Sequence, residues 1–139
     1  MIGKTVNEIK VGDVGTYART VSEADVYMFG GVTGDLNPAH TNQVQSEKTM
    51  FKGRIAHGML TASYISTILG MYLPGPGTIF LSFECKFTKP VQFGDTITAT
   101  AKAVDVNVER NIVTFDCECV NQNGDKVVVA KATVMPPRA

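Results

Sequence analysis

Polar and apolar residues alternate along most of the second half of the chain, and this period of two is typical of strands with one buried face. The pattern predicts strands over residues 78–88, 96–106, 111–120 and, after the turn NQNGD, around 128–134. The side chains expected to face the core are Ile79, Leu81, Phe83, Cys85 and Phe87, then Ile97, Ala99, Ala101 and Ala103, then Val113, Phe115, Cys117 and Cys119, and finally Val128, Ala130, Ala132 and Val134. Because short connections join these strands, we expect consecutive strands to pair antiparallel.

A first helix is expected after a short strand over residues 14–20. The segment TVSEADVYMFGG begins with two overlapping capping signals, Thr20 with Glu23 and Ser22 with Asp25. Glycines at the end of this segment weaken the helical conformation. The helix is therefore expected to end where the stretch GVTGDLNPAH begins.

A second helix is expected over residues 58–73. Apolar side chains occupy every side of its helical wheel and are interrupted only by small polar residues, which predicts a helix buried on all sides. Strands of about ten residues reach about 33 Å, which is long enough to curl around such a helix. The pattern therefore predicts an α+β domain over residues 1–139, in which an antiparallel sheet wraps around one helix.

Composition and charge exclude several classes of function. Lys and Arg together number 13, as do Asp and Glu, so there is no net positive charge to attract nucleic acid. No apolar run approaches the roughly 20 residues that cross a bilayer, and no signal region is visible, so we expect a cytoplasmic protein that does not enter membranes. Cys85, Cys117 and Cys119 lack metal-site spacing and are interpreted as small core residues. Without H-E-x-x-H or a P-loop, neither a metal nor another cofactor is expected.

The stretch GVTGDLNPAH places Asp35 and His40 on one turn. One interpretation is ordinary turn chemistry, in which Asp and Asn bind local backbone and Pro fixes the corner. The other is an acid/base pair, because a turn at Asn37-Pro38 brings both side chains to the same side, where one small molecule can touch them.

The stretch RIAHGMLTAS adds a second candidate feature. Gly58 would lie in the first turn of the long helix, where amides lack intrahelical partners and favour negative charge. This position suits an oxyanion site, although a tight packing point explains a glycine there equally well. We interpret His57 as a helix cap and expect Ser63 to bond the preceding turn, whereas Ser66 fits either a pocket or a structural role.

The sequences FGGVTGDLNPAH and RIAHGMLTASYIS resemble the MaoC-like (R)-specific enoyl-CoA hydratases over about residues 10–135. The resemblance implies a hot-dog fold, an antiparallel sheet of five to six strands wrapped around a long central helix. It implies that Asp35 and His40 activate water, that the Gly58 amide binds the thioester oxygen, and that Ser66 lies in the active site. Asn37, in the same turn, is a further candidate for substrate binding. The implied reaction is syn hydration of a trans-2-enoyl-CoA to the (R)-3-hydroxyacyl-CoA. Ala39 departs from the family pattern, which usually has a larger aliphatic residue there.

Two alternatives remain open at this point. Most hot-dog thioesterases place a carboxylate on or beside the central helix, but no Asp or Glu occurs between Glu47 and Glu84. An acyl-CoA-binding module without catalysis would not need the Asp35/His40 pair. The candidates for contacts with CoA, chosen by position alone, are Lys52, Arg54, Lys86 and Lys89. A strand edge left open by a sheet of this size favours a homodimer, which the resemblance also implies.

Overall fold

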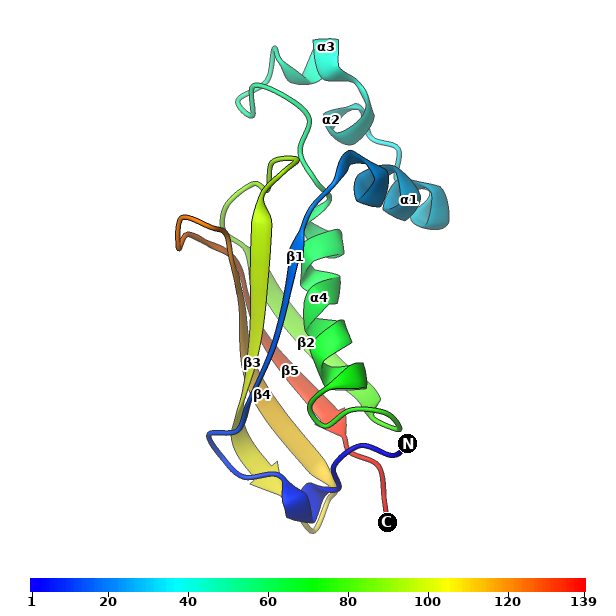
Figure 1. The fold of residues 1–139 in the computed structure, drawn as a ribbon, viewed down its shortest axis with the longest axis vertical. Coiled ribbons are helices and arrows are strands. Elements are labelled where there is room, and N and C mark those ends of the chain that lie inside the picture. Colours follow the sequence, from blue (N-terminus) through cyan, green and yellow to red (C-terminus); the bar gives the residue numbers. More distant parts are fainter.

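The computed structural model describes all 139 residues, and it consists of a five-stranded antiparallel sheet with a long helix across one face (Figure 1). The strands are β1 (Val14–Thr20), β2 (Ile79–Phe87), β3 (Thr96–Asn107), β4 (Ile112–Val120) and β5 (Lys126–Met135), in the order β1-β3-β4-β5-β2. The helices are a 3-10 turn (Val6–Glu8), α1 (Glu23–Thr33), α2 (Pro38–Thr41), α3 (Gln43–Ser46) and α4 (Gly58–Met71). None of these helices has the length and apolarity needed to span a bilayer.

The inward faces of the three central strands are those that the sequence predicts. Every expected side chain on β3, β4 and β5 is buried. The alanines of β3 are small, so α4 packs closely on them with Ile65, Ile68 and Leu69. Ser22 caps α1 in a capping box with Asp25, as the second of the two capping signals indicates.

For the first half of β2, the prediction of which side chains face the core is wrong. The register shifts between Phe80 and Ser82, so that Phe80 rather than Ile79 lies beside the buried Val134. Ile79 and Leu81 are exposed, and Phe87 is also largely exposed although it lies on the predicted side. The irregularity reverses which side chains face the core, and a prediction that assumes strict alternation along the whole strand misses this change.

The expected pairing of consecutive strands also fails for β2. This strand does not pair with β3, which follows it in the chain, but with β5, so β2 and β1 are the two edges of the sheet. Helix α4 is not buried on all sides either, because Met59, Ser66 and Met71 are exposed. Five strands cover only one side of the helix, and the other side remains open.

Helices α1, α2 and α3 lie together beyond the end of the sheet at which α4 begins (Figure 1). The segment that connects α3 with α4 runs back from this group to the first residue of α4. This arrangement brings the turn after α1 and the start of α4, which are far apart in the sequence, to the same end of the molecule.

Candidate active site

The turn that carries Asp35 is built by its own side chains. Helix α1 ends at Gly34, which has a φ of 83° and whose amide donates to the carbonyl of Gly30. The Asn37 amide then donates to Asp35 Oδ1 at 3.2 Å, and Asn37 Oδ1 accepts from the Ala39 amide at 3.0 Å, capping α2. Asn37, expected to contribute to substrate binding, thus has its side-chain oxygen engaged in the turn.

His40 lies on α2, is 9% exposed and has one fixed nitrogen. Its Nδ1 lies 2.7 Å from the carbonyl oxygen of Ile55. A carbonyl only accepts hydrogen bonds, so Nδ1 carries the hydrogen in this contact and Nε2 keeps its lone pair. In the neutral imidazole, Nε2 of His40 is therefore the available proton acceptor.

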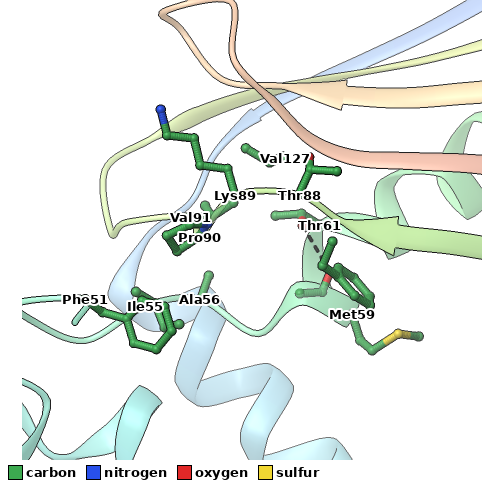
Figure 2. A pocket seen from close by; sticks show the side chains of 12 residues that line it. Phe51, Ile55, Ala56, Met59, Thr61, Thr88, Lys89, Pro90, Val91 and Val127 are labelled. Carbon is green, nitrogen blue, oxygen red and sulfur yellow. Dashed lines mark hydrogen bonds between the residues drawn. The ribbon is translucent and has the colours of Figure 1, made fainter. Parts of the chain in front are cut away.

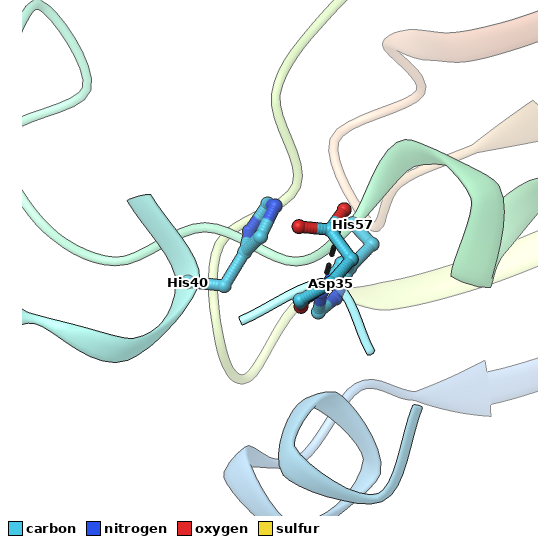
Figure 3. Close-up of side chains that lie close together, drawn as sticks. All are labelled: Asp35, His40 and His57. Atoms are coloured by element: carbon cyan, nitrogen blue, oxygen red, sulfur yellow. Dashed lines mark hydrogen bonds and ion pairs between the residues drawn. The ribbon is translucent and has the colours of Figure 1, made fainter. Parts of the chain in front are cut away.

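His57 occupies the N-cap position of α4, but the prediction that it acts as a cap is wrong, because its side chain makes no capping hydrogen bond. Its Nε2 instead donates to the carbonyl oxygen of Asp35 at 2.8 Å. The ring also stacks on that of His40, with centroids 3.7 Å apart and planes inclined by 28°. The side chain is 3% exposed. Figure 3 shows Asp35, His40 and His57 gathered from three separate segments.

The carboxylate of Asp35 lies within reach of both rings. Its Oδ2 is 4.0 Å from His57 Nε2, and one polar atom from each of Asp35, His40 and His57 falls within 4.8 Å of the others. A water molecule that makes two hydrogen bonds of about 2.8 Å can bridge atoms up to about 5.5 Å apart. Asp35 and His40 can therefore hold the same water. These three side chains could also serve as metal ligands, but one nitrogen of each imidazole is engaged by a carbonyl group.

Gly58 is the first residue of α4, and its amide has no acceptor within the helix. It borders a cavity of about 400 Å³ between the start of α4 and the end of β2 (Figure 2). The lining is mainly apolar and consists of Phe51, Ile55, Ala56, Gly58, Met59, Thr61, Phe87, Thr88, Lys89, Pro90, Val91 and Val127. A Cβ on Gly58 would lie 2.7 Å from Phe87 Cδ1, so the ring covers the space that a side chain would need. Asp35 and His40 do not line this cavity.

The two serines of α4 differ in their partners. Ser63 Oγ donates to the Met59 carbonyl at 2.6 Å, as expected for a hydroxyl in a helix. Ser66 is exposed on the open side of α4, about 12 Å along the axis from Gly58 at 1.5 Å per residue. The structure does not bring Ser66 to the Asp35/His40 turn.

The four basic residues selected as contacts for CoA are widely separated. Lys89 lines the cavity beside Gly58 and forms an ion pair of 2.6 Å with Asp125. Arg54 is bound to Glu23, and this hydrogen bond raises the pKa of the guanidinium. Lys86 lines a separate hollow on the other face of the sheet, and Lys52 is exposed with a φ of 59°. Of the four, only Lys89 lies at the candidate site.

Comparison with known proteins gives likenesses that extend over most of the chain. A model of the MaoC like domain matches residues 6–123. The (R)-specific enoyl-CoA hydratase of Rhodospirillum rubrum is 46% identical over 130 residues, which cover 94% of this chain and 90% of that protein. The 3-hydroxybutyryl-CoA dehydratase of Methylorubrum extorquens is 36% identical over 132 residues, which cover 94% and 83%. The structure of unliganded R-hydratase PhaJ1 from Pseudomonas aeruginosa superposes with a TM-score of 0.93 at 36% identity, covering 99% and 88% of the chains.

Proposed function

Because the chain belongs to the MaoC-like domain family, we propose that it is an (R)-specific enoyl-CoA hydratase. It adds water reversibly and with syn geometry across the double bond of a trans-2-enoyl-CoA, which gives the (R)-3-hydroxyacyl-CoA. One observation carries the proposal. Polar atoms of Asp35 and His40 lie within 4.8 Å of one another, and contacts with Ile55 and His57 hold the two residues; Gly58, whose amide has no partner within the helix, follows His57 directly in the chain.

The proton acceptor in this mechanism is Nε2 of His40. The carboxylate of Asp35 accepts one O–H of the water and orients it, while His40 takes the other proton as the oxygen attacks C3 of the substrate. The protonated imidazole then returns that proton to C2. Both new bonds form on the face of the substrate where the water was held, which accounts for syn addition. Proton transfers of this kind each contribute about 10²–10⁴-fold to the rate.

The amide of Gly58 supports the same reaction from the carbonyl side. Attack at C3 moves negative charge onto the thioester oxygen, and an amide at a helix N-terminus stabilises that charge in the transition state more than in the ground state. The apolar cavity beside Gly58 offers a place to bury an apolar part of the thioester. Lys89 at its edge carries a positive charge suited to the phosphates of CoA.

The test of the function uses crotonyl-CoA. We expect the absorbance of the conjugated thioester to fall without release of free CoA, whereas a thioesterase releases CoA and a binding module changes neither. Asp35→Asn and His40→Gln should each lower kcat by about 10²–10⁴-fold with an unchanged circular dichroism spectrum. Asp105→Asn, which changes an exposed carboxylate on β3, is the matched control and should retain wild-type activity. Wild-type rates in both site variants would contradict the assignment.

The role of Lys89 is tested separately by its effect on KM. We expect Lys89→Ala to raise KM for crotonyl-CoA several-fold, by about 3–10-fold for one partly exposed charge, and to leave kcat unchanged. Lys86→Ala is the matched control, because Lys86 lines the hollow on the other face of the sheet. Equal KM values for the two variants would argue against Lys89 as a contact for CoA.

We expect the reaction to require no metal ion and no organic cofactor. The conjugated thioester is itself electrophilic, and the proposed proton transfers and charge stabilisation use only Asp35, His40 and the Gly58 amide. Dialysis against EDTA should therefore leave kcat unchanged. A loss of activity that zinc restores would contradict this expectation.

A homodimer is the proposed working form. Strand β2 is an edge strand, and its apolar residues Ile79 and Leu81 are exposed, as is Met59 on the adjacent open side of α4. Pairing two copies would cover these residues and the unpaired edge. Sedimentation equilibrium should give the mass of a dimer, and Leu81→Lys should shift it toward the monomer. A wild-type monomer at micromolar concentration would contradict the proposal.

We also propose that the protein works in a reducing compartment, such as the cytoplasm. All three cysteines are free, and Cys117 and Cys119 are buried without a disulfide. Disulfides are rare where glutathione keeps thiols reduced, so this state fits such a compartment. Fractionation of cells with an antibody against the protein tests the location.

A further inference from the structure

His57 is a buried titratable side chain that the proposed chemistry does not use. It is 3% exposed, and its Nδ1 is buried without any hydrogen-bond partner. We propose that His57 is a positioning residue, which holds Asp35 and His40 in the arrangement that lets them share one water; this role rests on the proposed function. His57 itself touches neither the water nor the substrate in this arrangement.

The first contact fixes the backbone at Asp35. His57 Nε2 donates to the Asp35 carbonyl oxygen at 2.8 Å, across 22 residues of sequence. Asp35 is otherwise exposed on a turn, and its side chain is 55% accessible. A buried donor that binds its backbone ties this turn to the first residue of the long helix. The hydrogen bond also requires the hydrogen on Nε2, and in the neutral ring Nδ1 is then an acceptor without a partner.

The second contact fixes the ring of His40. The two imidazoles stack at 3.7 Å between centroids, while the Ile55 carbonyl holds His40 Nδ1 at 2.7 Å. These two restraints set both the plane of the His40 ring and its rotation within that plane. The direction of its Nε2 lone pair is thereby determined.

Gly30 provides the space for this arrangement. It lies inside α1, where glycine is less favourable than alanine because it loses more backbone entropy. A Cβ at Gly30 would lie 3.0 Å from Leu36 Cδ2 and 3.7 Å from His57 Cε1. The missing side chain therefore lets the Asp35 turn and the His57 ring come close to the helix.

The ring of Phe29 packs against His57 from α1, with its centroid 5.0 Å from that of His57. His57 thus lies between α1, the Asp35 turn and His40, and it directly precedes Gly58. One side chain connects both reactive groups with the amide proposed to bind the substrate oxygen.

Two substitutions separate the hydrogen bond from the stacking. His57→Phe keeps an aromatic ring beside His40 but cannot donate to Asp35. His57→Gln keeps an N–H at a similar distance from the backbone. We expect His57→Phe to lower kcat by about 10²-fold, the cost of misplacing reactive groups by about 1 Å, with KM changed less than about threefold. His57→Gln should recover at least about tenfold of that loss.

Tyr64→Phe is the matched control. Tyr64 is also a buried aromatic residue with an unpartnered polar atom, but it packs against Tyr17 away from the turn. A purely structural role for His57 predicts that His57→Phe lowers thermal stability and keeps wild-type kcat in the folded fraction. Tyr64→Phe removes a buried hydroxyl that has no partner, so it should keep both wild-type kcat and wild-type stability. Wild-type kcat in His57→Phe would overturn the proposal.

A measurement on the wild-type protein gives a second readout that does not depend on turnover. Long-range proton–nitrogen NMR correlations report which imidazole nitrogen carries the hydrogen. We expect the hydrogen on Nε2 of His57 and on Nδ1 of His40 near neutral pH. A hydrogen on Nδ1 of His57 would overturn the proposal even with full activity. If the wild-type protein fails to hydrate crotonyl-CoA, the proposed function fails, while the NMR result still decides whether His57 holds the turn.

Discussion

The substitution Gly58→Ala tests the oxyanion role with a magnitude that the structure supplies. The added Cβ would lie 2.7 Å and 2.8 Å from Phe87 Cδ1 and Cε1. Carbon atoms in contact prefer about 3.5–4.0 Å, so the ring must retreat by about 1 Å. Phe87 is 51% exposed, so this shift turns the ring toward solvent rather than into packed core. We expect a stability cost of about 1 kcal/mol, at the low end for overpacking.

The expected loss of activity is larger than this loss of stability. The methyl group and the displaced ring both lie beside the amide that is proposed to bind the thioester oxygen. A misplacement of about 1 Å costs about 10²-fold in rate, or about 2.7 kcal/mol of transition-state stabilisation. Initial rates with crotonyl-CoA measure this loss, and thermal unfolding measures the stability.

Two further variants make this prediction specific. Phe87→Leu removes the ring edge that the new Cβ meets, so Gly58→Ala with Phe87→Leu should recover at least about tenfold of the lost rate. Gly70→Ala adds a methyl group to the same helix, where nothing lies within 4 Å of the new Cβ. It should keep wild-type activity and gain up to about 1 kcal/mol of stability from helix propensity. Full activity in Gly58→Ala would show that the substrate oxygen is not bound at this amide.

Two further predictions follow from charge and burial. The hydrogen bond from Arg19 lowers the pKa of Asp25 to about 2. Because the pKa of Asp25 is lower in the folded state than in the unfolded state, ionised Asp25 stabilises the fold above about pH 5, and this contribution is lost as the pH falls toward 2. Since Arg19 is exposed, solvent screening reduces the contribution to about 1 kcal/mol. Asp25→Asn should therefore lower stability to urea at neutral pH but not at about pH 2, and equal losses at both would contradict the pairing. Burial raises the pKa of the Cys117 and Cys119 thiols to about 12, so iodoacetamide at neutral pH should label neither until the protein is unfolded, as mass spectrometry can check.

The central part of the fold follows from local patterns. Over residues 96–103 of β3 and 113–119 of β4, apolar residues alternate strictly with polar ones, so only one phase buries the apolar set. Strand β2 is different, because Phe80 and Leu81 are adjacent apolar residues and either phase gives an apolar face. The bulge between Phe80 and Ser82 gives the two halves of the strand different phases of alternation. The local sequence pattern contains no signal for this bulge. Pairing of β2 with β5 is a non-local choice that short connections do not determine.

The candidate site was predictable where its chemistry lies on one turn. Asp35 and His40 are five residues apart, and the glycine and proline around them indicate a turn without knowledge of the rest of the fold. The contacts of His57 were not predictable, because they join segments that only the folded chain brings together. Its place before a helix suggested a cap, but a position before a helix does not determine the direction of a side chain. Phe87 was missed as a neighbour of Gly58 for the same reason, since β2 follows α4 in sequence but returns to its first residue in space.

The incomplete burial of α4 connects the proposed dimer with the proposed chemistry. A helix that is apolar on every side should be buried on every side, yet Met59 is exposed and the sheet covers only the opposite side. Met59 and Phe87 both line the cavity beside Gly58, and both are more than half exposed. A second copy that covers this open side would therefore complete the wall of the cavity and exclude water from it, which strengthens the interaction of the Gly58 amide with developing charge. Dilution should then lower specific activity in parallel with the dimer fraction. Full activity in a monomeric Leu81→Lys variant would show that the chemistry does not depend on the dimer.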